Sequence, residues 1–231
     1  DGFKYSESSV PVKDRPLLDQ WVLSELNTLV DLVQTNYNNY EPTLVGRNIQ
    51  SFVIDKLSNW YVRLCRRRFW KGDYDVGKIS AYQTLYTCLI TVSRISSPLA
   101  PFFMERLFLD LNTVVKKDRV ESVHLSSFPK TKRGLINKSL ESRMALTKDI
   151  CSLALSIRKK ENIRVRQPLE SINICLNNVD LEGGLLTDLI MSEINVKSVL
   201  FSNKSEGVVK ACLVPNFSVL GKKYGKLMRE I

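Results

Sequence analysis

Residues 56–72 read KLSNWYVRLCRRRFWKG, and they combine a helical apolar pattern with a dense run of positive charge. At about 100° per residue, Leu57, Trp60 and Leu64 fall on one face of a helix. The stretch also holds six cationic residues and no carboxylate; the cations are Lys56, Arg63, Arg66, Arg67, Arg68 and Lys71. The pattern predicts a helix that buries one face and presents positive charge on the other.

Helical spacing continues on both sides of this stretch. Apolar residues recur every three or four positions from Ile49 through the stretch to about Trp70, and the same spacing predicts further helices at residues 16–38, 79–98, 102–111 and 135–160. Pro and Gly interrupt the pattern, and a polar, basic loop is expected from Lys116 to Arg133. Amphipathic helices joined by short loops predict an antiparallel helical bundle.

The period of the apolar pattern changes near Asn162. Alternating apolar residues between Val165 and Leu176 predict one strand, and β-branched runs predict strands at 196–201 and 208–214. A short helix is expected from Gly184 to Glu193, and another begins near Val219. The predicted fold class is therefore α+β overall and mainly α, with an antiparallel helical bundle followed by a small α+β domain.

The composition is that of an ordinary folded protein with an excess of positive charge. The 231 residues are 44% apolar and include 34 Lys and Arg against 24 Asp and Glu, which gives a net charge of +10. This length suits one or two domains. No run approaches the ~18 apolar residues of a membrane-spanning helix, and the N-terminus has no signal-peptide pattern, so we expect a cytoplasmic protein without a membrane partner.

Several kinds of chemical site are excluded by what the sequence lacks. There is one histidine, and the five cysteines form no C-x-x-C pair, so neither a metal site nor a disulfide framework is predicted. Phosphate-loop, dinucleotide-binding and nucleophile-elbow motifs are also missing. We therefore expect no catalytic residue and no bound cofactor or metal. Because the sequence starts at Asp1, we expect a fragment of a longer protein.

The positive charge is interpreted as a surface for nucleic acid. Guanidinium groups match phosphate oxygens two at a time, and the cluster is rich in Arg and has no acids within it. The alternative is a solvated charged face that serves solubility. Phe69 and Trp70 either stack on an unpaired base or pack on the bundle, and packing is the preferred interpretation. The candidate RNA-binding residues are Arg63, Arg66, Arg67, Arg68, Trp70 and Lys71, with Arg164 and Arg166 at the junction to the small domain.

Four segments together resemble the isoleucyl-tRNA synthetases, in the region that follows the catalytic core. They are SNWYVRLCRRRFW (58–70), SPLAPFFMERLFLDL (97–111), SVHLSSFP (122–129) and IRVRQPL (163–169). The Arg triplet after N-W-Y and the V-R-Q-P-L junction look most like the isoleucyl enzymes. Residues 171–231 resemble more loosely the C-terminal domain of their eukaryotic-like form, and the zinc-binding cysteines of many bacterial members are missing.

The resemblance implies a helical domain that binds the anticodon stem-loop of an isoleucine tRNA. Residues 1–14 are then an extension from the catalytic core, 15–162 the anticodon-binding domain, and 163–231 a small α+β domain that is truncated. The parent enzyme attaches isoleucine to its tRNA with ATP and magnesium. The H-x-G-H and K-M-S-K-S signatures of its core are absent here, so this fragment should be inactive alone. In a eukaryotic source, other synthetase subunits are further candidate partners.

Two alternatives stay open at this point. One is the equivalent region of a sister synthetase, the valyl, leucyl or methionyl enzyme. The other is a basic helical module for protein interaction, whose charge only keeps it in solution. The sequence does not identify the residues that read the anticodon bases.

Overall fold

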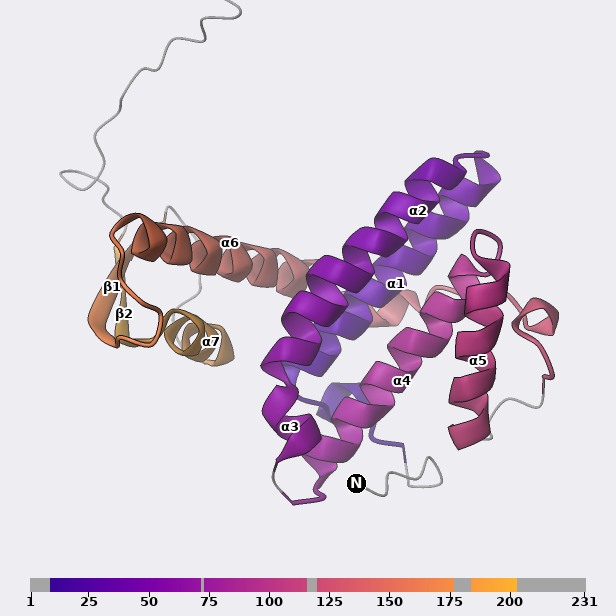
Figure 1. Ribbon diagram of the computed structural model, residues 1–231, viewed down its shortest axis with the longest axis horizontal. Helices are drawn as coiled ribbons and strands as arrows, with labels where there is room; N and C mark the ends of the chain where they lie inside the picture. The colour runs from indigo at the N-terminus through magenta and orange to yellow at the C-terminus, as the bar shows by residue number, and fades with distance from the viewer. Residues whose placement is uncertain (1–8, 72, 116–119, 177–183, 203–231) are drawn as a thin grey trace, which may run out of the picture. The chain divides into compact units, whose positions relative to one another are not determined.

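Helices make up most of the computed structural model, which describes residues 9–71, 73–115, 120–176 and 184–202 (Figure 1). The chain divides into two units, Asp1–Ile150 and Cys151–Ile231. Helix α6, Lys138–Lys160, is continuous through the division. The predicted class, mainly helical with a small α+β part, is confirmed. The predicted domain boundary after residue 162 stays a prediction, and most of the predicted extension 1–14 lies outside the described residues.

The first unit is built from α-helices, and the first long one packs directly against two of the others. These helices are α1 (Leu17–Asn38), α2 (Pro42–Ser51), α3 (Arg66–Trp70), α4 (Val76–Ser96) and α5 (Pro101–Val115). Helix α1 contacts α2 and α4, and α4 contacts α3 and α5 (Figure 1). Five of the six apolar residues spaced along one face of the first predicted helix are buried, Leu18, Val22, Leu26, Leu29 and Val33, and the sixth, Tyr37, is half-buried. Burial of this stripe explains why α1 lies at the centre of the unit.

The segment from Ile49 to Trp70 is not the single α-helix that the spacing predicts. Helix α2 passes at Phe52 into a π-helix, Phe52–Val62, in which backbone hydrogen bonds join residues five positions apart. Cys65, at φ −83° and ψ 4°, then interrupts the helix, and α3 begins at Arg66. Leu57 and Trp60 are buried as predicted, while Leu64 is half-buried. Despite the π-helix and the break at Cys65, Arg63, Arg66 and Arg67 are exposed, as the predicted cationic face requires.

A buried carboxylate ties the start of α6 to α1. Glu141 accepts hydrogen bonds from Ser24 Oγ at 2.5 Å, Thr28 Oγ1 at 2.8 Å and Lys138 Nζ at 2.7 Å. Burial alone would raise the pKa of the Glu141 carboxyl, but these donors outweigh it and hold the pKa below its ordinary value. The Nε1 group of Trp60 also donates to Met144 Sδ at 3.3 Å, so the π-helix contacts α6 as well.

The second unit contains two parallel strands joined through a helix. Strand β1 (Leu169–Cys175) pairs with β2 (Val196–Ser202), with Leu169 opposite Val196 and Ile174 opposite Phe201, and α7 (Leu185–Ile194) connects them. Helix α7 and strand β2 agree with their predicted bounds to within one residue, and the first predicted strand is confirmed but begins at Leu169, four residues later than the alternation. The strand predicted at 208–214 and the helix predicted from Val219 lie outside the described residues.

Most of the described cysteines are buried in the core of the protein. Cys65, Cys88 and Cys151 are buried, Cys175 is half-buried, and Cys212 lies outside the described residues. Within the described ranges, no helix is both long enough and apolar enough to cross a bilayer, and no three His, Cys, Asp or Glu side chains are grouped to hold a metal ion.

Candidate nucleic-acid interface

Four of the predicted cations form an exposed surface from the end of the π-helix through α3. We call this surface the cationic ridge, and it consists of Arg63, Arg66, Arg67 and Lys71, each of them exposed. Four apolar or aromatic side chains of the same segment are buried: Leu57, Trp60, Tyr61 and Phe69. The segment therefore anchors its inner side in the core and carries positive charge on its outer side.

Aromatic rings orient two of the ridge guanidinium groups. The Arg63 guanidinium lies over the Trp60 ring at 5.3 Å, and its Nε donates to the Asn59 carbonyl at 2.8 Å. The Arg66 guanidinium lies over the Trp70 ring at 5.8 Å. Stacking of this kind restricts a long side chain and stabilises its charge. These two groups are therefore partly preorganised to contact an anion.

Phe69 and Trp70 have different environments, although they are adjacent. Phe69 is buried and makes edge-to-face contacts with Tyr61 at 6.4 Å and Tyr82 at 5.5 Å between ring centroids. Trp70 is 68% exposed and touches the bundle through the edge of Phe69 at 6.1 Å. The packing interpretation is confirmed for Phe69 but is wrong for Trp70, whose ring is mostly exposed beside the Arg66 guanidinium.

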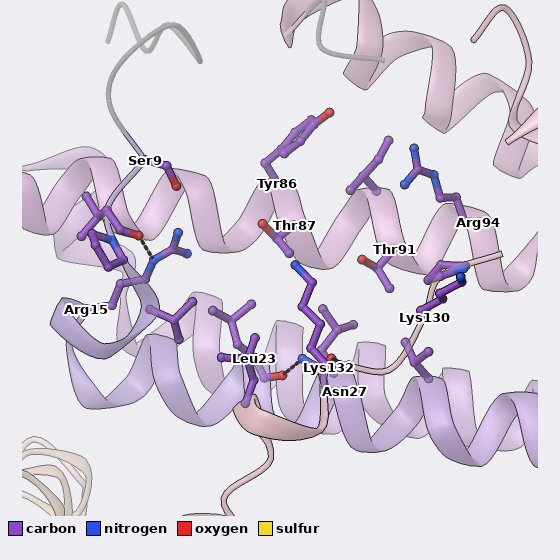
Figure 2. A pocket seen from close by; sticks show the side chains of 18 residues that line it. Ser9, Arg15, Leu23, Asn27, Tyr86, Thr87, Thr91, Arg94, Lys130 and Lys132 are labelled. Carbon is purple, nitrogen blue, oxygen red and sulfur yellow. Dashed lines mark hydrogen bonds between the residues drawn. The ribbon is translucent and has the colours of Figure 1, made fainter. Parts of the chain in front are cut away.

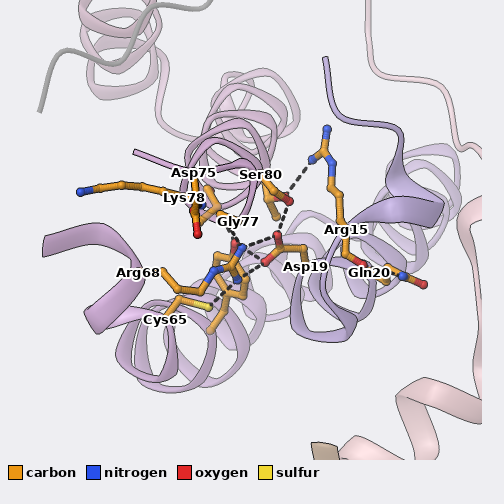
Figure 3. Close-up of polar contacts among 12 residues, drawn as sticks. Arg15, Asp19, Gln20, Cys65, Arg68, Asp75, Gly77, Lys78 and Ser80 are labelled. Carbon is orange, nitrogen blue, oxygen red and sulfur yellow. Dashed lines mark hydrogen bonds and ion pairs between the residues drawn. The ribbon is translucent and has the colours of Figure 1, made fainter. Parts of the chain in front are cut away.

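Arg68 does not belong to the exposed ridge, and this corrects the sequence prediction. Its Nη1 and Nη2 donate to the two carboxylate oxygens of Asp19 at 2.7 and 2.8 Å, and Nη2 also donates to the Gly77 carbonyl at 2.6 Å (Figure 3). Asp19 lies in α1 and is completely buried. The segment itself has no acid, but a carboxylate 49 residues earlier neutralises the last Arg of the 66–68 triplet.

The Asp19 carboxylate is the centre of a buried network that holds the ridge segment. Tyr61 donates to Oδ1 at 2.9 Å and Ser80 to Oδ2 at 2.5 Å, in addition to the two Arg68 bonds. The network thus joins α1, the π-helix, α3 and α4. Burial, reinforced by the Asp19 charge, raises the pKa of Tyr61 well above its usual range, so its hydroxyl stays a donor. Burial also raises the pKa of the Cys65 thiol to about 11.

The second predicted basic group lies in the second unit. Arg164 and Arg166 are exposed, in the turn before β1. Arg158 is buried instead: its guanidinium donates to the carbonyls of Arg164 at 3.2 Å, Gln167 at 3.1 Å and Asn195 at 3.1 Å. Arg158 therefore fixes the backbone of the turn that displays the other two. That they continue the ridge stays a prediction.

A hollow of about 450 Å³ adjoins the ridge on the side where α3 leads into α4. Its lining is mixed in charge: Arg67, Arg68, Lys71, Asp73, Asp75, Gly77 and Lys78. Figure 3 shows Arg68 and Gly77 together with Asp75 and Lys78 at this place. Sequence reasoning missed the hollow, because it treated Lys71 to Asp73 only as a helix breaker.

A second pocket, of about 530 Å³, lies between α1 and α4 (Figure 2). Leu23 and Asn27 of α1 and Thr87 and Thr91 of α4 form part of its walls. Cations line it and, among the residues that the structure describes, no carboxylate does; the cations are Arg15, Arg94, Lys130 and Lys132. The excess of positive charge is thus spread over more than one surface of the first unit.

Comparison with known proteins places these features in a family context. Residues 19–174 match the family model described as "Anticodon-binding domain of tRNA ligase". The chain is 49% identical over 233 residues to the isoleucine–tRNA ligase of Cytophaga hutchinsonii and 47% identical over 233 residues to that of Bacteroides thetaiotaomicron. It is 44% identical over 240 residues to the isoleucine–tRNA ligase of Porphyromonas gingivalis.

These similarities cover the whole of this chain but a small part of each relative. All three alignments include 100% of the chain and 20–21% of the relative, so the chain spans about a fifth of the length of these ligases. The relatives are bacterial, so the resemblance is not specific to eukaryotic enzymes. The match extends from α1 to β1 and includes the ridge and the network beneath it.

Proposed function

The chain belongs to the family of anticodon-binding domains of tRNA ligases, and from this premise we propose that it binds the anticodon stem-loop of an isoleucine tRNA as part of an isoleucine–tRNA ligase. The parent enzyme would attach isoleucine to that tRNA with ATP and magnesium at a catalytic core elsewhere. The H-x-G-H and K-M-S-K-S signatures of such a core are absent from this sequence. The fragment would therefore contribute RNA binding and no chemistry of its own.

The cationic ridge is the observation that carries the proposal. Its four side chains are exposed on a segment whose other side is anchored in the core, and the Arg63 and Arg66 guanidinium groups lie over aromatic rings. Arg is suited to phosphate because its planar donors match two oxygens at once. We assign the phosphate contacts to Arg63, Arg66, Arg67 and Lys71, and a stacking contact with an unpaired base to Trp70.

The amino acid specificity rests on the relatives. Identities of 44–49% across the whole chain to enzymes named as isoleucine–tRNA ligases favour the isoleucyl over the valyl, leucyl or methionyl assignment. We retain as proposals the cytoplasmic location and the likeness to the eukaryotic-like form. Association with other synthetase subunits is proposed only for a eukaryotic source.

Fluorescence anisotropy tests the function directly. A labelled isoleucine tRNA is titrated with the chain and compared with a valine tRNA and with the isoleucine tRNA carrying a changed anticodon. Tighter binding to the isoleucine tRNA, lost with its anticodon, is the expected result. Tighter binding to another tRNA would indicate a sister synthetase. Self-association without any affinity for RNA would support the protein-interaction module instead.

A further inference from the structure

The hollow beside the ridge has a combination of charges that a phosphate site alone does not require. We propose that it binds one ribose–phosphate unit of RNA, with Arg67 and Lys71 on the phosphate and Asp73 accepting a hydrogen bond from the ribose 2′-hydroxyl. The proposal rests on the tRNA-binding function and specifies which chemical groups of the RNA this place recognises. It makes the hollow a point at which the domain distinguishes RNA from DNA.

Three charged side chains of the hollow do not pair with one another. Arg67, Lys71 and Asp73 are exposed and line the same space. Within the described part of the chain, neither cation has a carboxylate oxygen within 4.0 Å, and Asp73 makes no side-chain hydrogen bond. When a cation and a carboxylate line the same space without pairing, the cation can bind an anionic group of a ligand and the carboxylate can accept a hydrogen bond from a donor group of the same ligand.

The two carboxylates of the hollow, Asp73 and Asp75, have different structural roles. Asp75 is the N-cap of α4: its Oδ1 accepts from the Lys78 backbone N–H at 2.7 Å. A helix cap of this kind serves folding. Asp73 does not cap a helix. Its backbone carbonyl accepts a hydrogen bond from the Asp75 N–H at 2.9 Å, and its side chain is exposed. Asp73 is therefore the acceptor assigned to the ligand.

Hydrogen bonds hold Arg68 in place at the floor of the hollow. Arg68 is held by both oxygens of Asp19 and by the Gly77 carbonyl. Gly77 leaves little free space, since a Cβ there would approach Asp75 Oδ1 to 3.3 Å. The Arg68–Gly77 hydrogen bond joins α3, which precedes the hollow, to the first turn of α4.

A ribose–phosphate unit fits this arrangement better than a free anion does. A carboxylate beside a phosphate repels it, so a site for inorganic phosphate would be weakened by Asp73. A ribose hydroxyl is a donor, and carboxylates accept from ribose hydroxyls in nucleotide-binding folds. The hollow also falls within the roughly 300–1,000 Å³ usual for ligand sites, at about 450 Å³.

The test uses anticodon stem-loops that each carry one 2′-deoxynucleotide, so that helix geometry is retained. With the unmodified chain, we expect one position at which loss of the 2′-hydroxyl weakens binding about five- to tenfold. In Asp73→Ala that position should cost less than about twofold, because the acceptor is gone. Asp73→Asn, which keeps an acceptor oxygen, should restore part of the effect. The matched control is Asp149→Ala, an exposed carboxylate of α6 outside the hollow.

The outcomes separate this inference from the function beneath it. If the chain binds the stem-loop but no 2′-deoxy position is sensitive, or if Asp73→Ala keeps the same sensitivity as the unmodified chain, the ribose contact is refuted and tRNA binding stands. If the unmodified chain binds no stem-loop at all, the proposed function fails together with the inference. Far-UV circular dichroism of each variant establishes that it is folded.

Discussion

The ion pair of Asp19 and Arg68 provides the sharpest prediction about how the ridge is held. In Arg68→Met the guanidinium is lost while an apolar side chain keeps much of the packing. Asp19, 0% exposed, then loses hydrogen bonds of 2.7 and 2.8 Å and keeps only the hydroxyls of Tyr61 and Ser80. The variant thus leaves a buried carboxylate without its counter-charge.

The expected loss in unfolding free energy is about 3 kcal/mol. Removal of one partner of a buried ion pair costs roughly 3–5 kcal/mol. The Arg68 side chain is 24% exposed, so water can reach the vacated space and the lower end of this range applies. In Asp19→Asn the guanidinium keeps its access to solvent, and we expect a loss of about 2 kcal/mol. In the double variant neither charge remains, so its free energy of unfolding should fall by about 3 kcal/mol. This loss is smaller than the sum of about 5 kcal/mol for the two single variants.

Urea unfolding followed by far-UV circular dichroism at neutral pH measures all four free energies in one cycle. A coupling of about 2 kcal/mol between the two positions is the predicted result. The reasoning is refuted if Arg68→Met loses less than about 1 kcal/mol or if the two single effects simply add. Arg67→Met is the matched control, because Arg67 is exposed beside Arg68, and it should change stability by less than about 0.5 kcal/mol.

Three further predictions concern single side chains. Trp70→Ala should lower stability by less than about 1 kcal/mol because the ring is exposed, whereas Phe69→Ala should cost roughly 3–5 kcal/mol; equal urea midpoints for the two variants would contradict their different burial. Because burial raises the pKa of Cys65 to about 11, its thiol should be neutral and unlabelled by a thiol reagent at about pH 8 until the chain unfolds; fast labelling of Cys65 in native buffer, mapped by mass spectrometry, would argue against this. Because the pKa of the Glu141 carboxyl is lowered on folding, its ionised form stabilises the folded state above the unfolded pKa, and this contribution is lost as pH falls through the folded pKa. In Glu141→Gln the free energy of unfolding should therefore depend less steeply on pH below about pH 4.5. Parallel pH profiles of unfolding free energy for the two proteins would exclude that role.

The sequence predicts the helices and the two described strands well because each has a repeating apolar pattern. The stripe of α1 and the alternation in β1 are local signals, and burial follows them. The change to a π-helix at Phe52 has no such signal, since apolar residues three and four apart suit either turn. The face assignment made at 100° per residue is nevertheless correct for the buried Leu57 and Trp60 and for the exposed cations Arg63, Arg66 and Arg67, while Leu64 is only half-buried.

The candidate site shows the same division between local and distant information. Exposure of Arg66 and Arg67 follows from a charged stretch, but the fate of Arg68 depends on Asp19, far away in the sequence. One sign was available: Asp19 stands three residues before Val22 and seven before Leu26, on the face of α1 that is apolar. An acidic residue on such a face indicates that a cation pairs with it in the core, although the sequence does not identify that cation.

The salt dependence of tRNA binding tests the central claim, that the cationic ridge contacts tRNA phosphates. The ridge variant carries Arg63→Glu, Arg66→Glu and Arg67→Glu, and its control carries Lys13→Glu, Arg47→Glu and Arg133→Glu, an equal change of charge at exposed cations on other segments. The account predicts that the ridge variant binds isoleucine and valine tRNAs more weakly, and to a similar extent. It also predicts that the slope of log affinity against log salt concentration becomes shallower by about 2–3, because each lost phosphate contact reduces that slope by about 0.9. Unchanged affinity and slope in a folded ridge variant, or equal losses in the two variants, would contradict it.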